Sequence, residues 1–191
     1  MSAWRVGSVF AILLGIAGVA SPAMAQERVA VMMSMAAPKL EFSPAQMDLA
    51  QAVSGDSDLA AFYGRNGLAP VFIGPDAEQR RVAVRQAIMA MPRHGIPASR
   101  YMPEALPEHP RSVADEVAYA KRAASILRDL SGGILTPSAV DPDIKRVPPR
   151  APVGQLLASF QSAADPAAVL VNAGPQSAAY LALQNALFGP E

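Results

Sequence analysis

The sequence predicts an all-α protein, organised as a compact multi-helix domain. Apolar residues recur at spacings of three and four through most of the chain, and glycines and prolines stand where the resulting helices should end. Composition agrees, because 51% hydrophobic and 17% charged residues in a chain of 191 are enough to bury a core. The chain has no cysteine, so its stability should depend on packing without disulfides.

The first 25 residues have the pattern of a secretory signal peptide. Arg5 supplies the positive charge, Val6 to Val19 form the apolar stretch, and Ala23-Met24-Ala25 places small residues at the positions that determine cleavage. A membrane anchor, the alternative, needs about 20 apolar residues. This run is shorter and meets Pro22. We therefore expect cleavage after Ala25, a periplasmic location, and no membrane attachment after cleavage.

Residues 26–42 are expected to form a flexible linker, because they are rich in Met, Ala and Val and carry no repeated helix or turn signal. Met32, Met33 and Met35 offer thioether ligands for a soft metal such as Cu(I). Clustered methionines without a repeat are more typical of an apolar linker, which is the interpretation we favour. The helical domain is predicted to span residues 43–189.

The first helix of this domain is predicted to begin at Ser43. This serine can cap the helix, Pro44 suits the first turn, and Gln46 stands in the capping-box position three residues after the cap. The helix should end by Gly55. Its expected apolar side consists of Met47, Leu49, Ala50 and Val53.

The second helix, Asp58 to Asn66, should precede an extended segment. Asp56 or Ser57 can cap this helix, and Gly67 supplies the left-handed conformation that ends a helix at low cost. Residues 68–73 are then predicted to run extended, because the proline within them disfavours helix at the residue before it.

A turn at Gly74-Pro75 leads into a long helix, predicted over Asp76 to His94 and ended by Gly95. The stripe expected to be buried comprises Val84, Ile88 and Met91. The other side carries Arg80, Arg81 and Arg85. These arginines could form an anion-binding patch for carboxylates. Charges on helices usually lie on a solvated face, and we favour that interpretation.

The longest helix is predicted over Ser112 to Leu130, with Gly132-Gly133 as its end. Asp115 in the first turn and Arg128 near the far end complement the helix dipole. One long stripe and its flank are apolar: Val113, Val117, Ala120, Ala124 and Leu127, widened by Tyr119, Ala123, Ile126 and Leu130. A helix with so wide an apolar face should cross the centre of the domain.

Three shorter helices should follow the proline-rich stretch Val147 to Pro152. The first is centred on Leu156, Leu157 and Phe160. The second is capped by Asp165, with Pro166 in its first turn. The last spans Gln176 to Phe188. The aromatic residues expected to join the core are Phe62, Tyr63, Phe72, Tyr101 and Tyr180.

Four segments of the chain resemble elements of one protein family. They are Phe62 to Phe72 with its Gly67 and Pro70, His94-Gly95 to Tyr101, Gly133 to Asp143, and Pro175 to Leu187. Together, over residues 43–188, they resemble the helical scaffold domain that precedes the catalytic domain in large bacterial L,D-transpeptidases. The chain departs from the family pattern at Ile96-Pro97 and at Ser177-Ala178. The resemblance implies a helical scaffold fold and a role in peptidoglycan remodelling.

The resemblance does not extend to catalytic residues. The catalytic domains of these enzymes use a cysteine thiolate with help from a histidine. This chain has no cysteine and no segment that resembles the family's His…Ser-x-Gly-Cys block. We therefore expect no catalytic residue, no cofactor-binding residue and no cofactor, and a chain that is not an enzyme.

Two other kinds of site fit the sequence less well. His94 and His109, with Glu104 and Glu108, lack the number and spacing of ligands that zinc uses, so no metal site is expected. Ser54-Gly55-Asp56-Ser57 resembles the nucleophile block of a family of serine hydrolases. It follows a helix rather than a strand, and helix capping explains it.

Sixteen basic and sixteen acidic residues cancel, which argues against a nucleic-acid partner. The leading hypothesis is an exported, non-catalytic scaffold or interaction domain linked to peptidoglycan remodelling in the cell wall. Its partner would be a transpeptidase catalytic domain, another cell-wall protein, or peptidoglycan itself. The stretch Val147 to Pro152 is a candidate contact, although a plain connector is the simpler interpretation.

Two alternatives stay open at this stage. The chain could be a truncated or split L,D-transpeptidase, whose catalytic cysteine domain is encoded elsewhere or lost. It could also be an unrelated periplasmic helical adaptor. The DNA downstream would distinguish the first from a stand-alone domain, and a structure without the family's topology would indicate the second.

Overall fold

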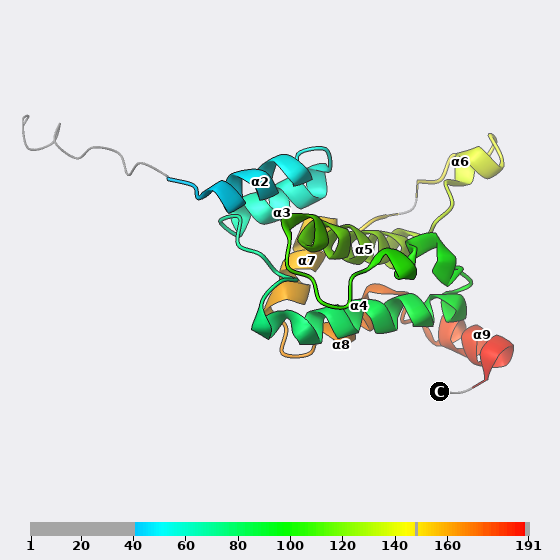
Figure 1. The fold of residues 1–191 in the computed structure, drawn as a ribbon. Helices are drawn as coiled ribbons and strands as arrows, with labels where there is room; N and C mark the ends of the chain where they lie inside the picture. The colour runs from blue at the N-terminus through cyan, green and yellow to red at the C-terminus, as the bar shows by residue number, and fades with distance from the viewer. Residues whose placement is uncertain (1–40, 148, 190–191) are drawn as a thin grey trace, which may run out of the picture. The chain divides into compact units, whose positions relative to one another are not determined.

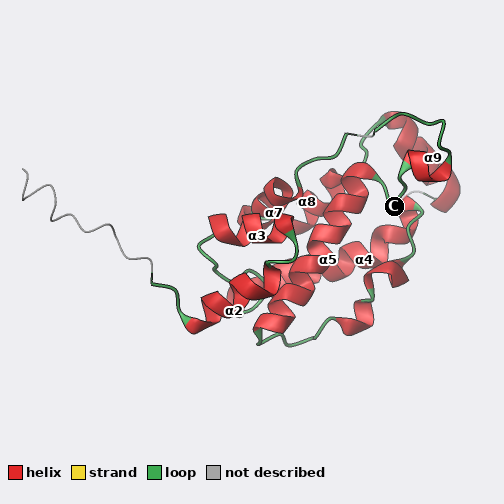
Figure 2. Cartoon of the chain, turned by 90° about the horizontal axis from the view of Figure 1, so that it is seen from above, coloured by secondary structure: helices red, strands yellow, loops and turns green. Residues whose placement is uncertain are grey.

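The computed structural model of the protein describes residues 41–147 and 149–189, and all of these after Glu41 belong to the compact unit Phe42–Glu191. Within these ranges the secondary structure is helical and contains no strand, as Figure 2 shows. The predicted all-α fold class is therefore confirmed. The predicted signal peptide and most of the predicted linker lie outside the described residues. No helix in the described ranges is long and apolar enough to cross a membrane.

The described elements follow the chain in this order: α2 Pro44–Val53, α3 Ser57–Arg65, η1 Pro75–Ala77, α4 Glu78–Ala90, η2 Met91–His94, η3 Ala98–Tyr101, η4 Pro103–Ala105, α5 Val113–Gly132, α6 Pro137–Val140, α7 Val153–Ser162, α8 Pro166–Ala173 and α9 Ala178–Phe188. The four η elements are short 3-10 helices. They lie in the connections before and after α4, where prolines and glycines prevent a longer α-helix.

The predicted starts of α2, α5 and α8 are confirmed, because the side chains that cap these helices are local to them, whereas α4 and α9 begin two residues later than predicted, at Glu78 and Ala178. Ser43 and Ser112 each form a capping box, with Gln46 and Asp115 respectively. The carboxylate of Asp165 likewise accepts hydrogen bonds from two backbone N–H groups at the start of α8.

Helix α5 is the centre of the unit and packs against α2, α3, α4, α7 and α8. In Figure 1, α2 and α3 lie on one side of it and α4 and α8 on the other. The predicted stripe is buried as expected, with Leu127 fully enclosed and only Val113 at its start half-buried. Ring stacking joins the layers, because Phe72 stacks on Tyr119 and on Phe160 with centroid distances of 5.7 and 5.9 Å.

The predicted helix over residues 76–94 is wrong as a single element. Pro92 has no N–H to donate to the carbonyl of Ile88, so the N–H of Met91 bonds to Ile88 as well as Ala87 and the chain tightens into η2. The predicted end is correct, since Gly95 adopts a left-handed φ of 73°. The expected stripe, Val84, Ile88 and Met91, is buried.

The predicted solvated face of α4 is also wrong. Arg81 is only 8% exposed, and its guanidinium donates to the carbonyls of Phe72 and Gly74 and pairs with Glu78. The Arg80 Nε donates to Val71 O at 2.8 Å. The Arg85 Nη1 donates to the hydroxyl of Tyr119 at 2.5 Å. Arg81 is therefore buried, and Arg80 and Arg85 are half-buried while their guanidinium groups bond to the residues before α4 and to the aromatic core.

In α2, Leu49 and Val53 are buried as predicted, whereas Met47 is exposed. Met47 lies two residues before Leu49, or about 200° around the helix axis, and therefore points away from α5. The core contains the predicted Phe62, Tyr63, Phe72 and Tyr101. Tyr180 in α9 is half-buried and lies outside the core.

Candidate functional site

A groove lies where α5 ends. It encloses about 390 Å³. Its lining comes from three separate parts of the chain: His94, Gly95 and Ile96; Asp129, Leu130, Gly133, Ile134 and Leu135; Pro175 and Tyr180. Figure 1 places α6 and α9 at this end of the unit, away from α2, and Figure 2 shows α9 there as well. We call it the C-terminal groove.

Two glycines allow the chain to form this groove. Gly95 ends η2 at a φ of 73°, and Gly133 ends α5 at a φ of 74°, conformations that other residues rarely adopt. Each glycine redirects the chain across the end of α5. As a result the apolar residues that follow, Ile96 after the first and Ile134 and Leu135 after the second, line the groove.

Helix α9 is attached to this end through η2. The Nδ1 of His94 and the hydroxyl of Tyr180 are 2.7 Å apart, and their rings stack with a centroid distance of 6.1 Å. The Nε2 of Gln184 donates to Arg93 O, and an Arg93 guanidinium N–H donates to Gly189 O. Burial raises the pKa of the Tyr180 hydroxyl, so this hydroxyl stays protonated through the physiological pH range.

The inner wall of the C-terminal groove contains one buried carboxylate, that of Asp129. Its Oδ2 accepts hydrogen bonds from Arg100 Nε and from the Tyr101 hydroxyl, each at 2.8 Å. Burial, followed by the adjacent Asp129 carboxylate, raises the pKa of Tyr101 above its usual range. Asp129 is thus occupied in fixing η3 against α5, which shapes the groove wall.

The rim of the groove is apolar and exposed. Helix α9 contains no charged residue, and none of its residues, all of which are described, is buried. Leu183 and Leu187 are 59% and 66% exposed and lie outside the core. The exposed apolar residues of α9 are Leu181, Leu183, Leu187 and Phe188, and those after α5 are Ile134, Leu135, Val140, Ile144 and Val147, of which the last three alternate with the exposed charges of Asp141, Asp143, Lys145 and Arg146. Exposed apolar surface of this kind is typical of interaction sites.

A second cluster, missed from the sequence, surrounds the carboxylate of Glu116 in α5, which is 1% exposed. Glu116 Oε1 accepts from the Tyr63 hydroxyl at 2.5 Å and from Val71 N at 2.7 Å, and Oε2 accepts from Phe72 N and Ile73 N at 2.7 and 2.9 Å. Burial, then the adjacent carboxylate, raises the pKa of Tyr63 far above its usual range.

The weighed alternatives do not come together in space. His94 contacts Tyr180 in the C-terminal groove, whereas His109 lines a separate cavity with Arg81 and Arg111. The described part of the chain contains no group of three or more histidines and carboxylates able to hold a metal. Asp56 caps α3, as predicted. The methionines proposed for Cu(I) lie outside the described residues.

Comparison with known families gives one match. The family described as "Scaffold domain" matches residues 57–187, from α3 to α9. The chain belongs to the L,D-transpeptidase scaffold domain family. Searches of the curated proteins and of the solved structures gave no match.

In this scaffold domain, three of the four segments that carry the family resemblance meet in the C-terminal groove. They contribute His94-Gly95, Gly133 to Leu135, and Pro175 with Tyr180. The fourth, Phe62 to Phe72, belongs to the Glu116 cluster. The family-like residues therefore build two distinct places in the fold, one buried and one open.

Proposed function

We propose that this scaffold domain is an exported, non-catalytic docking module for peptidoglycan remodelling. In this proposal it binds a transpeptidase catalytic domain, or another cell-wall protein, through the C-terminal groove and its apolar rim. The export step rests on the signal-peptide pattern of residues 1–25. The cell-wall role rests on membership of the scaffold family.

One observation carries the docking role: three segments far apart in the sequence converge on an open apolar groove beside an uncharged helix. A monomer gains no stability from leaving Leu183 and Leu187 in water. A partner that covered them would recover that hydrophobic free energy, as the apolar core of a protein interface does. The described residues of the stretch Val147 to Pro152 are also exposed, and this stretch would lie at the edge of such an interface.

The non-catalytic part of the proposal has a chemical basis. Transfer onto a stem peptide by a thiolate needs a cysteine, and these 191 residues contain none. The chemistry would come from the docked partner. The same surface would serve the alternative, a split or truncated L,D-transpeptidase, with the catalytic cysteine domain encoded elsewhere. Purified protein should leave the terminal D-alanine of a tetrapeptide stem unexchanged. Turnover that is lost on mutating a residue of this chain would contradict the proposal.

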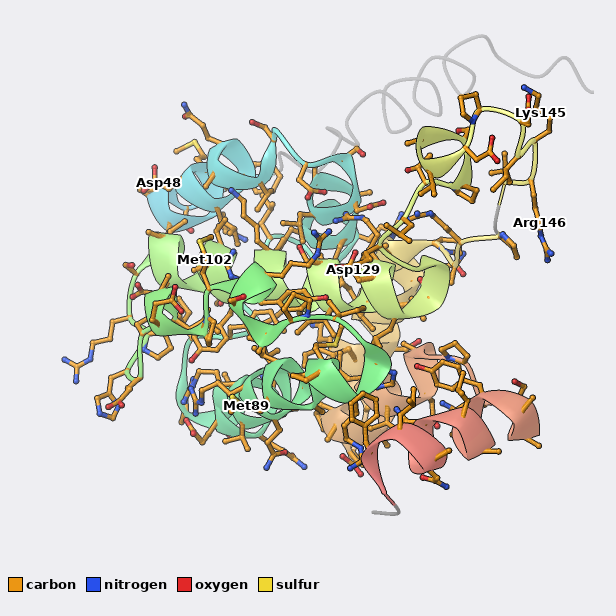
Figure 3. All side chains as sticks on the ribbon, turned by 90° about the vertical axis from the view of Figure 1, so that its right-hand side faces the viewer. Asp48, Met89, Met102, Asp129, Lys145 and Arg146 are labelled. Atoms are coloured by element: carbon orange, nitrogen blue, oxygen red, sulfur yellow. The ribbon has the colours of Figure 1, made fainter. Side chains whose placement is uncertain are left out.

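The docking role can be tested by crosslinking in the periplasm, followed by mass spectrometry of the captured proteins. We expect a cysteine transpeptidase domain or another cell-wall enzyme among them. Leu183→Glu and Leu187→Glu should each remove that capture, because a carboxylate would have to be desolvated in the apolar interface. Met89→Glu is the matched control, since Met89 is exposed on α4 and does not line the groove (Figure 3).

A different result would assign the domain to the polymer itself. If the purified protein sediments quantitatively with sacculi in high salt and captures no protein, direct peptidoglycan binding replaces docking. Equal capture by the leucine variants and by Met89→Glu would also contradict a role for the C-terminal groove.

A further inference from the structure

A second surface lies around residues 67–74, which we call the 67–74 segment. Two cavities meet there, and Pro70 and Ile73 line both. One cavity, of about 310 Å³, is walled by apolar residues of α2, the 67–74 segment and α5, among them Leu49, Leu68 and Val113. The other, of about 540 Å³, opens on the far side of Pro70 and Ile73.

The 67–74 segment is a rigid support, although it is neither helix nor strand. Glu116 accepts the N–H groups of Val71, Phe72 and Ile73. Arg80 and Arg81 donate to carbonyls of the same stretch, and Gln46 Nε2 donates to Gly67 O. Leu68, whose N–H donates to Tyr63 O at 2.8 Å, has a φ of 57°, a conformation that a non-glycine residue adopts only when its surroundings impose it.

The larger cavity is cationic. Arg81, His109 and Arg111 line it, and no described carboxylate does. Arg81 is paired with Glu78, but the guanidinium of Arg111 has no hydrogen-bond or ion-pair partner within the described part of the chain. Two acids lie close to Arg111 in sequence: Glu108 forms no hydrogen bond or ion pair with it in the described part of the chain, and Asp115 is occupied by the backbone N–H groups of Arg111 and Ser112. A carboxylate entering this cavity would therefore find an available guanidinium.

We propose that the 67–74 segment is a docking site for a peptide segment in which a large apolar side chain stands next to a carboxylate. The apolar side chain enters the cavity between α2 and α5. The carboxylate enters the cavity on the other side of Pro70 and Ile73 and pairs with Arg111, for which the planar guanidinium is well suited. The C-terminal groove takes no part in this binding, so the proposal for the 67–74 segment can be tested independently of the proposed function of the groove.

The chemistry of the two cavities favours a peptide over other anions. A polyphosphate backbone would need several basic residues in a row, whereas the cavity offers one available guanidinium, and the chain as a whole has no net charge. A bound peptide also satisfies both cavities at once, because neighbouring residues of an extended chain are about 3.3 Å apart along its axis and can straddle Pro70 and Ile73.

The test is a titration of the 15N-labelled full-length chain, followed by two-dimensional NMR, with three acetylated and amidated dipeptides. Ac-Leu-Glu-NH2 is the probe, Ac-Leu-Gln-NH2 lacks the carboxylate, and Ac-Ala-Glu-NH2 lacks the large apolar group. We expect the first to shift amide signals of residues 68–74 and 109–113 at millimolar concentration. Each of the other two should bind roughly tenfold more weakly.

Arg111→Gln should weaken binding of Ac-Leu-Glu-NH2 by about tenfold and remove its preference over Ac-Leu-Gln-NH2. The variant should fold normally, because the Arg111 side chain is exposed and has no partner among the described residues. Arg146→Gln is the matched control, since Arg146 is an exposed arginine on the loop after α6, far along the chain from this site (Figure 3). It should leave binding unchanged.

Three outcomes would overturn the proposal. The first is the absence of shifts in residues 68–74 at any concentration up to the solubility limit of the probe. The second is equal binding of the probe by the wild-type chain and Arg111→Gln. The third is binding to phosphatidylglycerol vesicles that Arg111→Gln removes, which would assign the site to an anionic lipid surface.

Discussion

The 67–74 segment and α9 differ in backbone regularity and in burial, and in opposite directions. The segment has no regular secondary structure, yet Val71 and Phe72 are buried and its polar backbone groups are bonded to side chains of α2, α4 and α5. Helix α9 is regular over eleven residues, yet it buries none of them, and its side chains are hydrogen-bonded to His94 and Arg93 of η2. Regular backbone and tertiary burial are thus separate properties in this protein.

The difference shows where the fold is specified. A helix of eleven residues is marginal alone in water, so α9 depends on what it contacts. The 67–74 segment depends on contacts even more, but those contacts are made by charged side chains already locked in the core. Helix α9 therefore presents a surface that a partner can cover. The 67–74 segment, in contrast, cannot move unless its hydrogen bonds to side chains of the core are broken.

The largest expected effect is at Glu116. Glu116→Ala removes the acceptor for three backbone N–H groups and the Tyr63 hydroxyl, and we expect a loss of about 3 to 5 kcal/mol of unfolding free energy. Glu116→Gln, which keeps one acceptor oxygen, should lie between the alanine variant and the wild type. Urea denaturation measures both. A midpoint unchanged by the alanine substitution would show that the 67–74 segment does not depend on this carboxylate.

A leucine pair compares the two regions directly. Leu127→Ala, in the core of α5, should lower the unfolding free energy by about 2 to 5 kcal/mol through the cavity it creates. Leu187→Ala, in the exposed rim, should change it by less than about 0.5 kcal/mol. Thermal or urea unfolding of the two variants side by side would decide the matter. Similar losses in both would mean that α9 is covered in the free protein.

Alkaline pH should act on the buried region first. The pKa values of Tyr63 and Tyr101 are raised in the folded state by burial, so the unfolded chain releases their protons first as the pH rises. Stability from each tyrosine is complete below about pH 10 and is lost above it, at about 1.4 kcal/mol per pH unit. Absorbance at 295 nm, followed with circular dichroism, should show these tyrosines ionising together with unfolding. Ionisation of all four tyrosines near pH 10 in a folded protein would contradict this.

The smallest effect is expected at the attachment of α9. Tyr180→Phe removes the hydroxyl that contacts His94 and should cost about 0.5 to 1.5 kcal/mol locally, without moving the global unfolding midpoint. Hydrogen exchange should quicken in α9 and remain unchanged in α5. If both helices exchange faster, α9 is part of the cooperative core and the contrast between the two regions fails.

The features that the sequence predicted well are those that are specified locally. Ser43, Asp56, Ser112 and Asp165 cap the helices that they precede, because a capping side chain bonds to backbone two or three residues away. The stripe of α5 was predictable for a similar reason, since its spacing follows the helical repeat. Pro92 was a signal that was overlooked, because a proline there excludes a continuous α-helix.

The two charged residues of the core were harder to assign, because their bonding partners are distant in sequence. Glu116 lies three residues after Val113 and four before Ala120, which places it on the apolar stripe. Arg81 lies three before Val84 and seven before Ile88. A charge on a buried stripe was the available signal in both cases. Nothing local indicated which backbone groups each one would bind.

The sequence predicted the segments that form the C-terminal groove but not the groove itself. The family-like segments were visible as separate motifs, but their meeting at the end of α5 depends on how the helices pack. The stripe formed by Tyr180, Leu183 and Leu187 predicted an apolar face of α9. It did not show whether that face would be covered by this chain, and the structure leaves its leucines exposed.

The bonds from Glu116 to Val71, Phe72 and Ile73 also have a consequence for the order of folding. They join residues separated by 45, 44 and 43 positions, so nothing within α3 or the 67–74 segment can form them early. The helices can nucleate from local contacts, whereas this stretch must wait until α5 has closed a long loop onto it. We expect its amide protons to acquire protection late in refolding, after those of α5, so that a segment among the most firmly bonded in the native state is among the last to form.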